Sequence, residues 1–358
     1  MFPEAEVSRI TRRLTPNGVR ELALDCGFSL AGIAQGDPVS DFSRYEAWVE
    51  RGLAGEMRYL TDHRGQIRSD PAYLLPGCRS VICTGLNYNG PEPYSTDFND
   101  AERAWISRYA WGEDYHTIVR EKLEQLARKL LEYEDFSWRA CVDTAPLLER
   151  SLARGAGLGW IGRNTCLINQ RLGSWLFLGE LLTTLDLAPD GPAPDRCGTC
   201  RRCIDACPTS AIVQSPNGGY ELDARLCISY FTIELRSAVP EAQRSAIGEN
   251  VFGCDICQDV CPWNRRAAVS EVESFRPRHE AAPPLERMAA LDEAEFREMF
   301  RGTPVTRAKY SGFLRNVVIA MGNTRSEKFR EPLGKLAQSE DALVAEHARW
   351  ALDQLASR

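Results

Sequence analysis

The sequence predicts three parts in chain order: an α/β (α+β) domain over residues 1–188, a small cysteine-rich domain over residues 189–270 and a helical module over residues 271–358. Three observations support this division. In the first part, two runs with the character of buried strands flank a run of helical periodicity. Eight of the 13 cysteines gather in the second part, and two further helical patterns follow in the third.

Buried strands are predicted over Ser80–Leu86 and Ser174–Thr184, because both runs are short and mostly apolar. Between them, apolar residues at helical spacing predict an amphipathic helix: Val119, Leu123, Leu126 and Leu130. The run 188–195 is rich in proline and breaks regular structure, so it is expected to link the first part to the second.

A second connector, Arg276–Pro284, precedes the C-terminal part. One helix is expected with Leu314, Val317, Val318 and Met321 on a single face and Asn323 as its stop. Another is expected from about Asp341 to Leu355. These patterns indicate a small helical module, which we expect to be HEAT-like.

Composition excludes several classes of protein. With 44% hydrophobic and 26% charged residues, the 358-residue chain is typical of a globular protein. Its charged N-terminus lacks the apolar core of a secretory signal, and no run approaches the ~20 apolar residues of a membrane span. We therefore expect a cytoplasmic protein whose clustered cysteines bind metal. A net charge of -7 argues against wholesale coating of nucleic acid.

The cysteine spacing is the strongest signal in the sequence. Cys197, Cys200, Cys203 and Cys207-Pro208 fit the C-x2-C-x2-C-x3-C-P run of bacterial ferredoxins, which binds 4Fe-4S clusters. A second run, Cys254, Cys257 and Cys261-Pro262, repeats its last three positions.

Ferredoxin symmetry then predicts the ligands of two clusters, because the fourth cysteine of each run serves the other cluster. The first cluster takes Cys197, Cys200, Cys203 and Cys261. The second takes Cys207, Cys254 and Cys257 with a replacement thiolate, for which Cys227 is the obvious candidate. A pair of zinc sites is the alternative, and the isolated cysteines are expected to be core residues: Cys26, Cys78, Cys83, Cys141 and Cys166.

Two motifs in the first part invite a functional interpretation. Gly157–Gly162 satisfies G-x-G-x-x-G, but it follows a predicted helix and precedes a predicted strand, the reverse of a dinucleotide site. Asp143 ends an alternating run just before Thr144 and Pro146. These predict a helix capped by Thr144, with Asp143 beside its positive end. The carboxylate could simply stabilise that helix, whereas a catalytic acid would need burial to hold its proton.

Two further clusters of residues are noted. Tyr109, Asp114, Tyr115 and His116 form an aromatic and polar group that could equally be a loop packed on the core. Residues 301–330 contain seven basic residues against one acidic residue, which indicates a solvated face or a surface for a phosphate backbone. On the second interpretation the nucleic-acid contacts are Arg307, Lys309 and Arg315.

The sequence as a whole resembles the epoxyqueuosine reductase family, which carries out the last step of queuosine synthesis in tRNA. The resemblance rests on blocks that include Ser107–Tyr109, Asp114–His116, Val142–Pro146, Glu149-Arg150, Gly157–Trp160, Gly179–Leu182, Cys227–Tyr230 and Cys254–Asn264. It implies a cobalamin-binding domain like that of reductive dehalogenases (nitroreductase-like), a two-cluster ferredoxin-like domain, and Asp143 as proton donor. It also implies cofactor neighbours: Arg68, Asp143, Asn164, Ile228 and Asp255.

The implied reaction removes the epoxide oxygen of epoxyqueuosine with two electrons and two protons. Electrons would pass from the outer cluster to the inner one and reduce cobalt to Co(I). The expected partners are tRNA carrying epoxyqueuosine and a low-potential electron donor, with the enzyme acting as a monomer. A corrinoid reductase of small molecules and a plain two-cluster electron carrier remain as alternatives.

Overall fold

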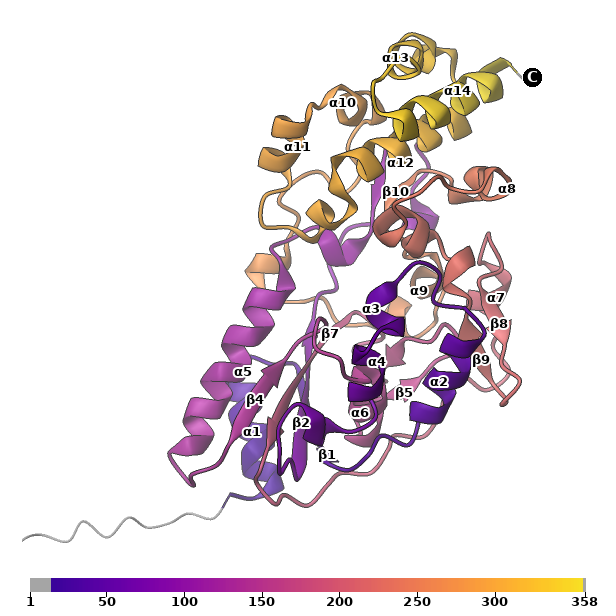
Figure 1. Cartoon of the computed structure of the whole chain (residues 1–358). Helices are drawn as coiled ribbons and strands as arrows, with labels where there is room; N and C mark the ends of the chain where they lie inside the picture. Colours follow the sequence, from indigo (N-terminus) through magenta and orange to yellow (C-terminus); the bar gives the residue numbers. More distant parts are fainter. Residues whose placement is uncertain (1–13, 357–358) are drawn as a thin grey trace, which may run out of the picture.

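The computed structural model describes residues 14–356 and is built around a four-stranded sheet near one end of an elongated molecule (Figure 1). The strand order is β1-β2-β7-β4, formed by Leu30–Gln35, Ser80–Asn87, Leu176–Thr183 and Trp138–Cys141. β2 pairs with β7 along its whole length. The two strands predicted from the sequence are therefore confirmed as the central pair. All three pairings are antiparallel, so the domain is α+β.

Helices cover both faces of this sheet. α1 (Pro16–Asp25) and α5 (Tyr115–Leu131) pack on one face, where Ile82 and Leu181 share a core with the apolar stripe of α5. α6 (Glu149–Gly155) packs on the other, against Val81 and Leu182. Successive strand residues thus point to opposite faces. A Cβ on Gly179 would lie 2.6 Å from the Val119 side chain, so glycine lets α5 approach the sheet closely.

The C-terminal part is helical, as predicted, and lies at the other end of the molecule (Figure 1). It consists of α10 (Leu285–Ala290), α11 (Glu293–Met299), α12 (Lys309–Thr324), α13 (Arg330–Leu336) and α14 (Ala342–Ala356). α12 is buried along most of its length and packs against α14. It ends one residue beyond the expected stop, Asn323, with Arg325 in a left-handed conformation (φ 54°).

The cysteine-rich part contains only short elements. They are α7 (Arg202–Asp205), the hairpin of β8 (Ile212–Gln214) and β9 (Tyr220–Leu222), α8 (Glu241–Arg244) and α9 (Ile256–Asp259). A second hairpin, β5 (Trp160–Ile161) with β6 (Leu167–Ile168), follows α6, so the glycine-rich loop does run from helix to strand as predicted. Three further short helices connect β1 to β2: α2 (Phe42–Glu50), α3 (Arg58–Thr61) and α4 (Arg64–Ile67).

The three parts are interleaved. β3 (Trp105–Ile106) pairs in parallel with β10 (Asn250–Phe252), although the two strands belong to different predicted parts. Residues 104–111 and 224–252 share one core with the C-terminal helices. The boundaries at 188 and 270 stay a prediction, because segments on both sides of each one pack together. Within residues 14–356, no helix combines the length and apolarity that a bilayer crossing requires.

Candidate active site and cluster domain

The centre of the candidate active site is a contact between His116 and Asp143. His116 lies in the first turn of α5, whose N-cap, Asp114, accepts the His116 backbone N–H at 3.0 Å. The imidazole lies between two carboxylates: Nδ1 is 2.6 Å from Asp114 Oδ1, and Nε2 is 3.2 Å from Asp143 Oδ2. Asp143 follows β4 and has a positive φ of 42°, a strained conformation for a residue other than glycine.

This contact decides where the proton resides. Burial alone would lower the pKa of His116, but its hydrogen bonds to Asp114 and Asp143 raise the pKa to about 9. Burial would conversely raise the pKa of Asp143, yet the hydrogen bond and charge of His116 hold it below the ordinary value. At neutral pH the pair is therefore an imidazolium beside a carboxylate, with its proton on His116.

The predicted helix end beside Asp143 is wrong. α6 begins at Glu149, and Thr144 caps nothing, because its hydroxyl donates to the Val142 carbonyl at 3.3 Å. The low pKa of Asp143 therefore comes chiefly from His116 rather than from a helix terminus. Sequence reasoning could not find this pairing, since the two residues meet only through the packing of α5 on the sheet.

The Asp143 side chain is 48% exposed. Tyr115 adds a hydrogen bond to it, and Tyr109 lies within electrostatic reach of both Asp143 and Asp255. Since Asp255 adjoins Cys254, Tyr109 lies between the His116–Asp143 pair and the cysteine loop.

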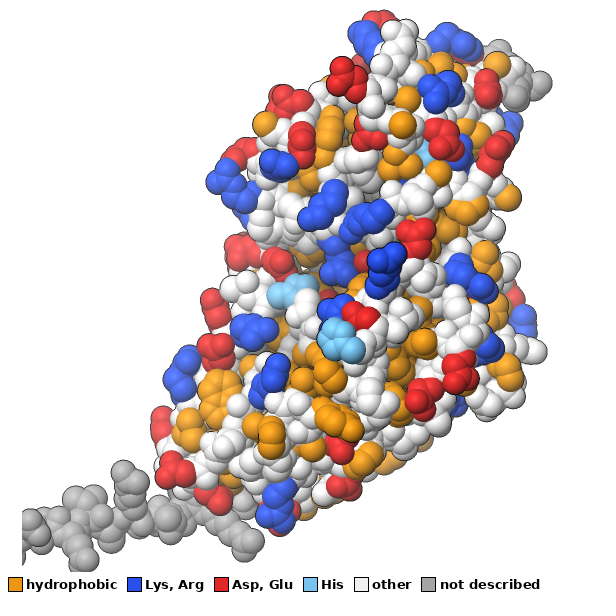
Figure 2. Space-filling model, viewed as in Figure 1, with side chains coloured by type: hydrophobic (Ala, Val, Ile, Leu, Met, Phe, Trp, Pro, Cys, Tyr) orange, Lys and Arg blue, Asp and Glu red, His pale blue; other side chains and the backbone are white. Residues whose placement is uncertain are grey.

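Arg307 brings the C-terminal part to this site. Its Nε donates to Glu234 Oε1 at 2.6 Å, its guanidinium lies 5.5 Å from the centre of the Tyr59 ring, and its charge helps to lower the pKa of Asp143. Glu234 ends a five-residue π-helix, Tyr230–Glu234, a distortion often found at functional sites. Figure 2 shows basic side chains gathered across the middle of this face, where the surface is hollowed between the two ends of the molecule.

Two acids, Glu180 and Glu149, lie within electrostatic reach of Asp143, and sequence reasoning assigned them no role. Glu180 pairs with Cys83 and Cys141 in the sheet, and neither of its carboxyl oxygens has a hydrogen-bond partner within residues 14–356. Burial, with the charges of Glu149 and Asp143, raises its pKa well above the ordinary value. Burial and the charge of Asp143 likewise raise the pKa of Glu149 to about 8. The sequence signal was a glutamate inside an otherwise apolar strand.

The cysteines of the first predicted set lie near one another. Burial, followed by the charges of Cys261, Cys197 and Cys200, raises the pKa of Cys203 to about 11. Cys197 and Cys261 also pack around Trp160 and Trp263. Four thiols that would repel one another as thiolates suit a cluster whose iron neutralises their charge.

The second set gathers in the same way. Burial raises the pKa of Cys254 well above its ordinary value, with Cys227 and Cys207 adding to the effect. Cys257 lies near Cys254 and Cys227, and also near Cys166, which was expected to be a core residue. Within residues 14–356, no three Cys, His, Asp or Glu side chains converge tightly enough to hold a single metal ion.

Four of the expected cofactor neighbours differ from Asp143, because they expose almost no surface. The exposed fraction is 6% for Arg68, 4% for Asn164, 3% for Ile228 and 1% for Asp255. Asp255 accepts hydrogen bonds from Ser107 Oγ at 2.5 Å and from the Arg108 N–H at 2.7 Å, so it anchors residues 107–108 to the cysteine loop. Asn164 donates to the Cys257 carbonyl at 3.3 Å. The contacts of Asp255 and Asn164 thus join the cysteine loop to other segments of the protein.

One expected nucleic-acid contact needs correction. Arg315 is 1% exposed and donates to the backbone carbonyls of Phe231, Leu235 and Ser237. A residue buried in this way cannot contact a phosphate backbone. Lys309, by contrast, is exposed at the start of α12, and Arg307 is partly exposed at the active site.

Comparison with known proteins identifies the class. Residues 196–264 match the family model described as "4Fe-4S double cluster binding domain", which makes the chain an iron-sulfur protein. Residues 68–144 match the model described as "Epoxyqueuosine reductase QueG, DUF1730".

Relatives narrow the class to a family. The epoxyqueuosine reductase of Xanthomonas campestris pv. campestris is 43% identical over 342 residues, covering 94% of this chain and 95% of its own. That of Escherichia coli K12 is 36% identical over 343 residues, covering 95% and 89%. The chain therefore belongs to the epoxyqueuosine reductase family.

Solved structures agree with this assignment. The Streptococcus thermophilus epoxyqueuosine reductase has a TM-score of 0.85 at 28% identity, covering 95% of this chain and 90% of its own. An epoxyqueuosine reductase crystallised with an epoxyqueuosine-modified tRNA-Tyr stem loop has the same score and identity, covering 95% and 89%. A Bacillus subtilis epoxyqueuosine reductase, with its catalytic aspartate loop swung out of the active site, has a TM-score of 0.84 at 27% identity over 95% and 90%.

Proposed function

We propose that this protein reduces epoxyqueuosine to queuosine in the anticodon loop of tRNA. The observation that carries the proposal is end-to-end membership of the epoxyqueuosine reductase family, together with two thiol sets beside a site that holds a proton. The epoxide oxygen leaves as water and a carbon–carbon double bond forms, which consumes two electrons and two protons.

The residues suit the cofactors that this reaction requires. Each thiol set offers four sulfurs for one 4Fe-4S cluster. Cys227, Cys254 and Cys257 are partly exposed, as Asp143 is. In this proposal Asp143, Tyr109 and Tyr115 are the residues of the first part that would contact a bound cobalamin. When bound, cobalamin supplies a cobalt centre that accepts single electrons and delivers a pair.

Asp143 and His116 act as one proton-donating unit in this proposal. A carboxylate whose pKa is depressed is a poor acid by itself, but the neighbouring imidazolium holds a proton at 3.2 Å. Asp143 would present that proton to the departing oxygen while His116 restores it. An aspartate loop is catalytic in the Bacillus subtilis relative, which supports this role for Asp143. Glu149 and Glu180, held neutral by burial, would supply the second proton.

The substrate is expected to approach from the side of the C-terminal helices, which we take as a HEAT-like module that contacts tRNA. Arg307 and Lys309 are the basic residues proposed to meet the phosphate backbone. The crystallised complex of a relative with a modified stem loop supports tRNA as the substrate. Because tRNA is cytoplasmic, we place the enzyme in the cytoplasm, acting as a monomer.

The test is turnover on the modified tRNA. Protein reconstituted anaerobically with iron, sulfide and cobalamin should convert epoxyqueuosine to queuosine when supplied with dithionite, as read by mass spectrometry of the digested nucleosides. A reconstituted protein that leaves the epoxide intact, or that reduces a small organohalide but not the tRNA, would overturn the proposal.

A further inference from the structure

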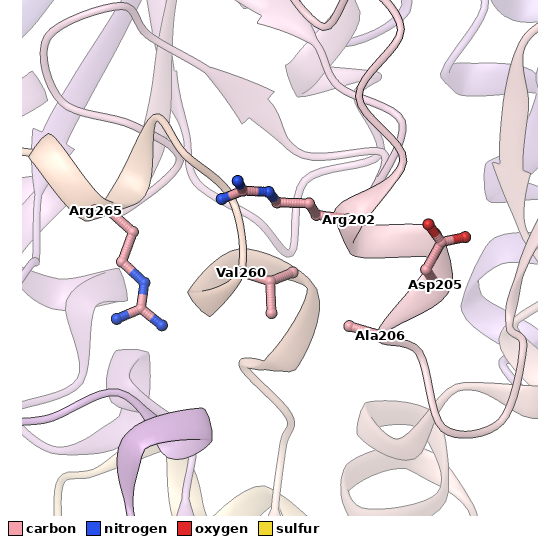
Figure 3. Close-up of a pocket in the computed structure, with 5 residues that line it drawn as sticks. All are labelled: Arg202, Asp205, Ala206, Val260 and Arg265. Carbon is pink, nitrogen blue, oxygen red and sulfur yellow. The ribbon is translucent and has the colours of Figure 1, made fainter.

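A surface cavity lies where two cysteine-bearing segments meet. It measures about 560 Å³ and is lined by Arg202, Asp205 and Ala206 from one segment and by Val260 and Arg265 from the other. In Figure 3 the guanidinium groups of Arg202 and Arg265 extend into the same open space beside Val260. Arg202 precedes Cys203 and Val260 precedes Cys261, so the wall of the cavity is one residue away from two ligands of the first set.

Positive charge is in excess around this cavity. Asp205 pairs with Arg201 at 3.4 Å, and Asp97 pairs with Arg265 at 2.6 Å, so these neighbouring acids are already neutralised. The side chains of Arg196, Arg202 and Arg266 have no hydrogen-bond or ion-pair partner within residues 14–356. We call the face beside the first thiol set the outer-cluster surface: Arg202 lines the cavity, and Arg196 and Arg266 adjoin Cys197 and Arg265 in the sequence. These three unpaired arginines make it basic within a chain of net charge -7.

We propose that the outer-cluster surface docks an acidic protein that carries single electrons. The inference rests on the proposed function, because it needs a cluster on the first thiol set. A 4Fe-4S cluster accepts one electron at a time, whereas a nicotinamide transfers a hydride, so the donor must be a one-electron carrier. In each encounter the reduced centre of the carrier loses one electron and the cluster gains one. Two such encounters supply the two electrons that reduction of one epoxide requires.

Charge complementarity identifies the partner. Basic side chains beside a redox centre steer an acidic partner to it and accelerate association, an effect that salt screens. The cavity is open and shallow, which suits contact with a protein surface better than enclosure of a small molecule. Small redox partners bury modest interfaces and bind transiently, so a few arginines can contribute much of the encounter energy.

The experiment uses a flavodoxin as the probe, because it is an acidic protein with a one-electron flavin. Its dissociation constant for the cluster-loaded enzyme is measured by calorimetry at low and at moderate salt, and cluster reduction is followed by loss of visible absorbance. The double variant Arg202→Glu/Arg266→Glu, which reverses two charges, is compared with Arg128→Glu, which reverses one charge at an exposed arginine of α5.

We expect the double variant to bind flavodoxin at least about tenfold more weakly and with a flatter salt dependence, while Arg128→Glu binds as the wild type does. Equal binding by the double variant, or wild-type binding that salt leaves unchanged, would overturn the proposal. With excess dithionite, which needs no docking surface, turnover of the double variant should equal that of the wild type. If neither the wild type nor the double variant reduced the tRNA epoxide with dithionite, the proposed function would be refuted. The flavodoxin-binding measurement would still test the outer-cluster surface.

Discussion

His116 Nε2 lies 3.2 Å from Asp143 Oδ2, although 27 residues separate the two in the chain. The contact joins the first turn of α5 to the strained residue that follows β4. It leaves the proton of the pair on the imidazole, and Asp114 on the other side of the ring reinforces that placement. In the proposed mechanism the two residues act together, because His116 holds the proton and Asp143 presents it to the substrate.

Replacing Asp143 by Asn should lower turnover by about 10²–10⁴-fold, the usual contribution of a positioned acid. The pKa of His116 should fall at the same time, because the variant loses a carboxylate that favours the charged ring. Single-turnover assays and NMR titration of the His116 ring measure the two effects. Asp135→Asn, at an exposed position before β4, is the matched control. Wild-type turnover with a lowered His116 pKa would remove the acid role.

The pH dependence of turnover should carry a limb set by His116. Because the pKa of this group is raised to about 9, the ring is protonated below that value and loses its proton as pH rises through it. Activity should therefore decline above about pH 9. Rate profiles of the wild type and of His116→Gln check this, since the variant should be slow throughout and lack the limb. A wild-type profile that stays flat to pH 10 would contradict the assignment.

Glu180→Gln should change how stability depends on pH. Burial raises the pKa of Glu180 in the folded protein, so above the ordinary glutamate pKa the unfolded chain is ionised while the folded one keeps its proton. The wild type should then lose stability relative to the variant as pH rises above the ordinary glutamate pKa, by up to about 1.4 kcal/mol per pH unit. Denaturant unfolding measures the difference, with the exposed Glu121→Gln as control. If the stabilities of the wild type and of Glu180→Gln changed with pH in the same way, Glu180 would have to ionise in the folded protein as it does in the unfolded chain.

Arg315 and Lys309 should give opposite results. Arg315→Ala leaves three buried carbonyls without their donor and should reduce the free energy of unfolding by about 3 kcal/mol or more, with little direct effect on tRNA affinity. Lys309→Glu should leave stability nearly unchanged but weaken tRNA binding and lower its salt slope by about 1. Thermal unfolding and binding titrations at several salt concentrations distinguish them. If Arg315→Ala kept the stability of the wild type but bound tRNA more weakly, Arg315 would be a tRNA contact and the correction made above would be wrong.

Local patterns predicted what depends on local chemistry. Cys-Pro spacing predicted two groups of cysteines, whose role as cluster ligands stays a prediction. Continuous apolar runs found β2 and β7, because burial on both faces leaves few polar residues. Counting charges failed at Arg315, since a basic run does not reveal which side of α12 faces the core. The same limit applies to the contact of His116 with Asp143 and to Asp255. Their partners lie in distant segments that only the packed sheet and the pairing of β3 with β10 bring together.

The number of iron atoms held by the cysteines tests the central claim most directly. Anaerobically reconstituted wild-type protein should contain about eight irons per chain, Cys227→Ala should contain about four, and Cys166→Ala should match the wild type. Cys166 is the sharp control, because it lies near Cys257 as Cys227 does. Zinc in place of iron, far fewer than eight irons in the wild type, or loss of iron on replacing Cys166 rather than Cys227 would contradict the account.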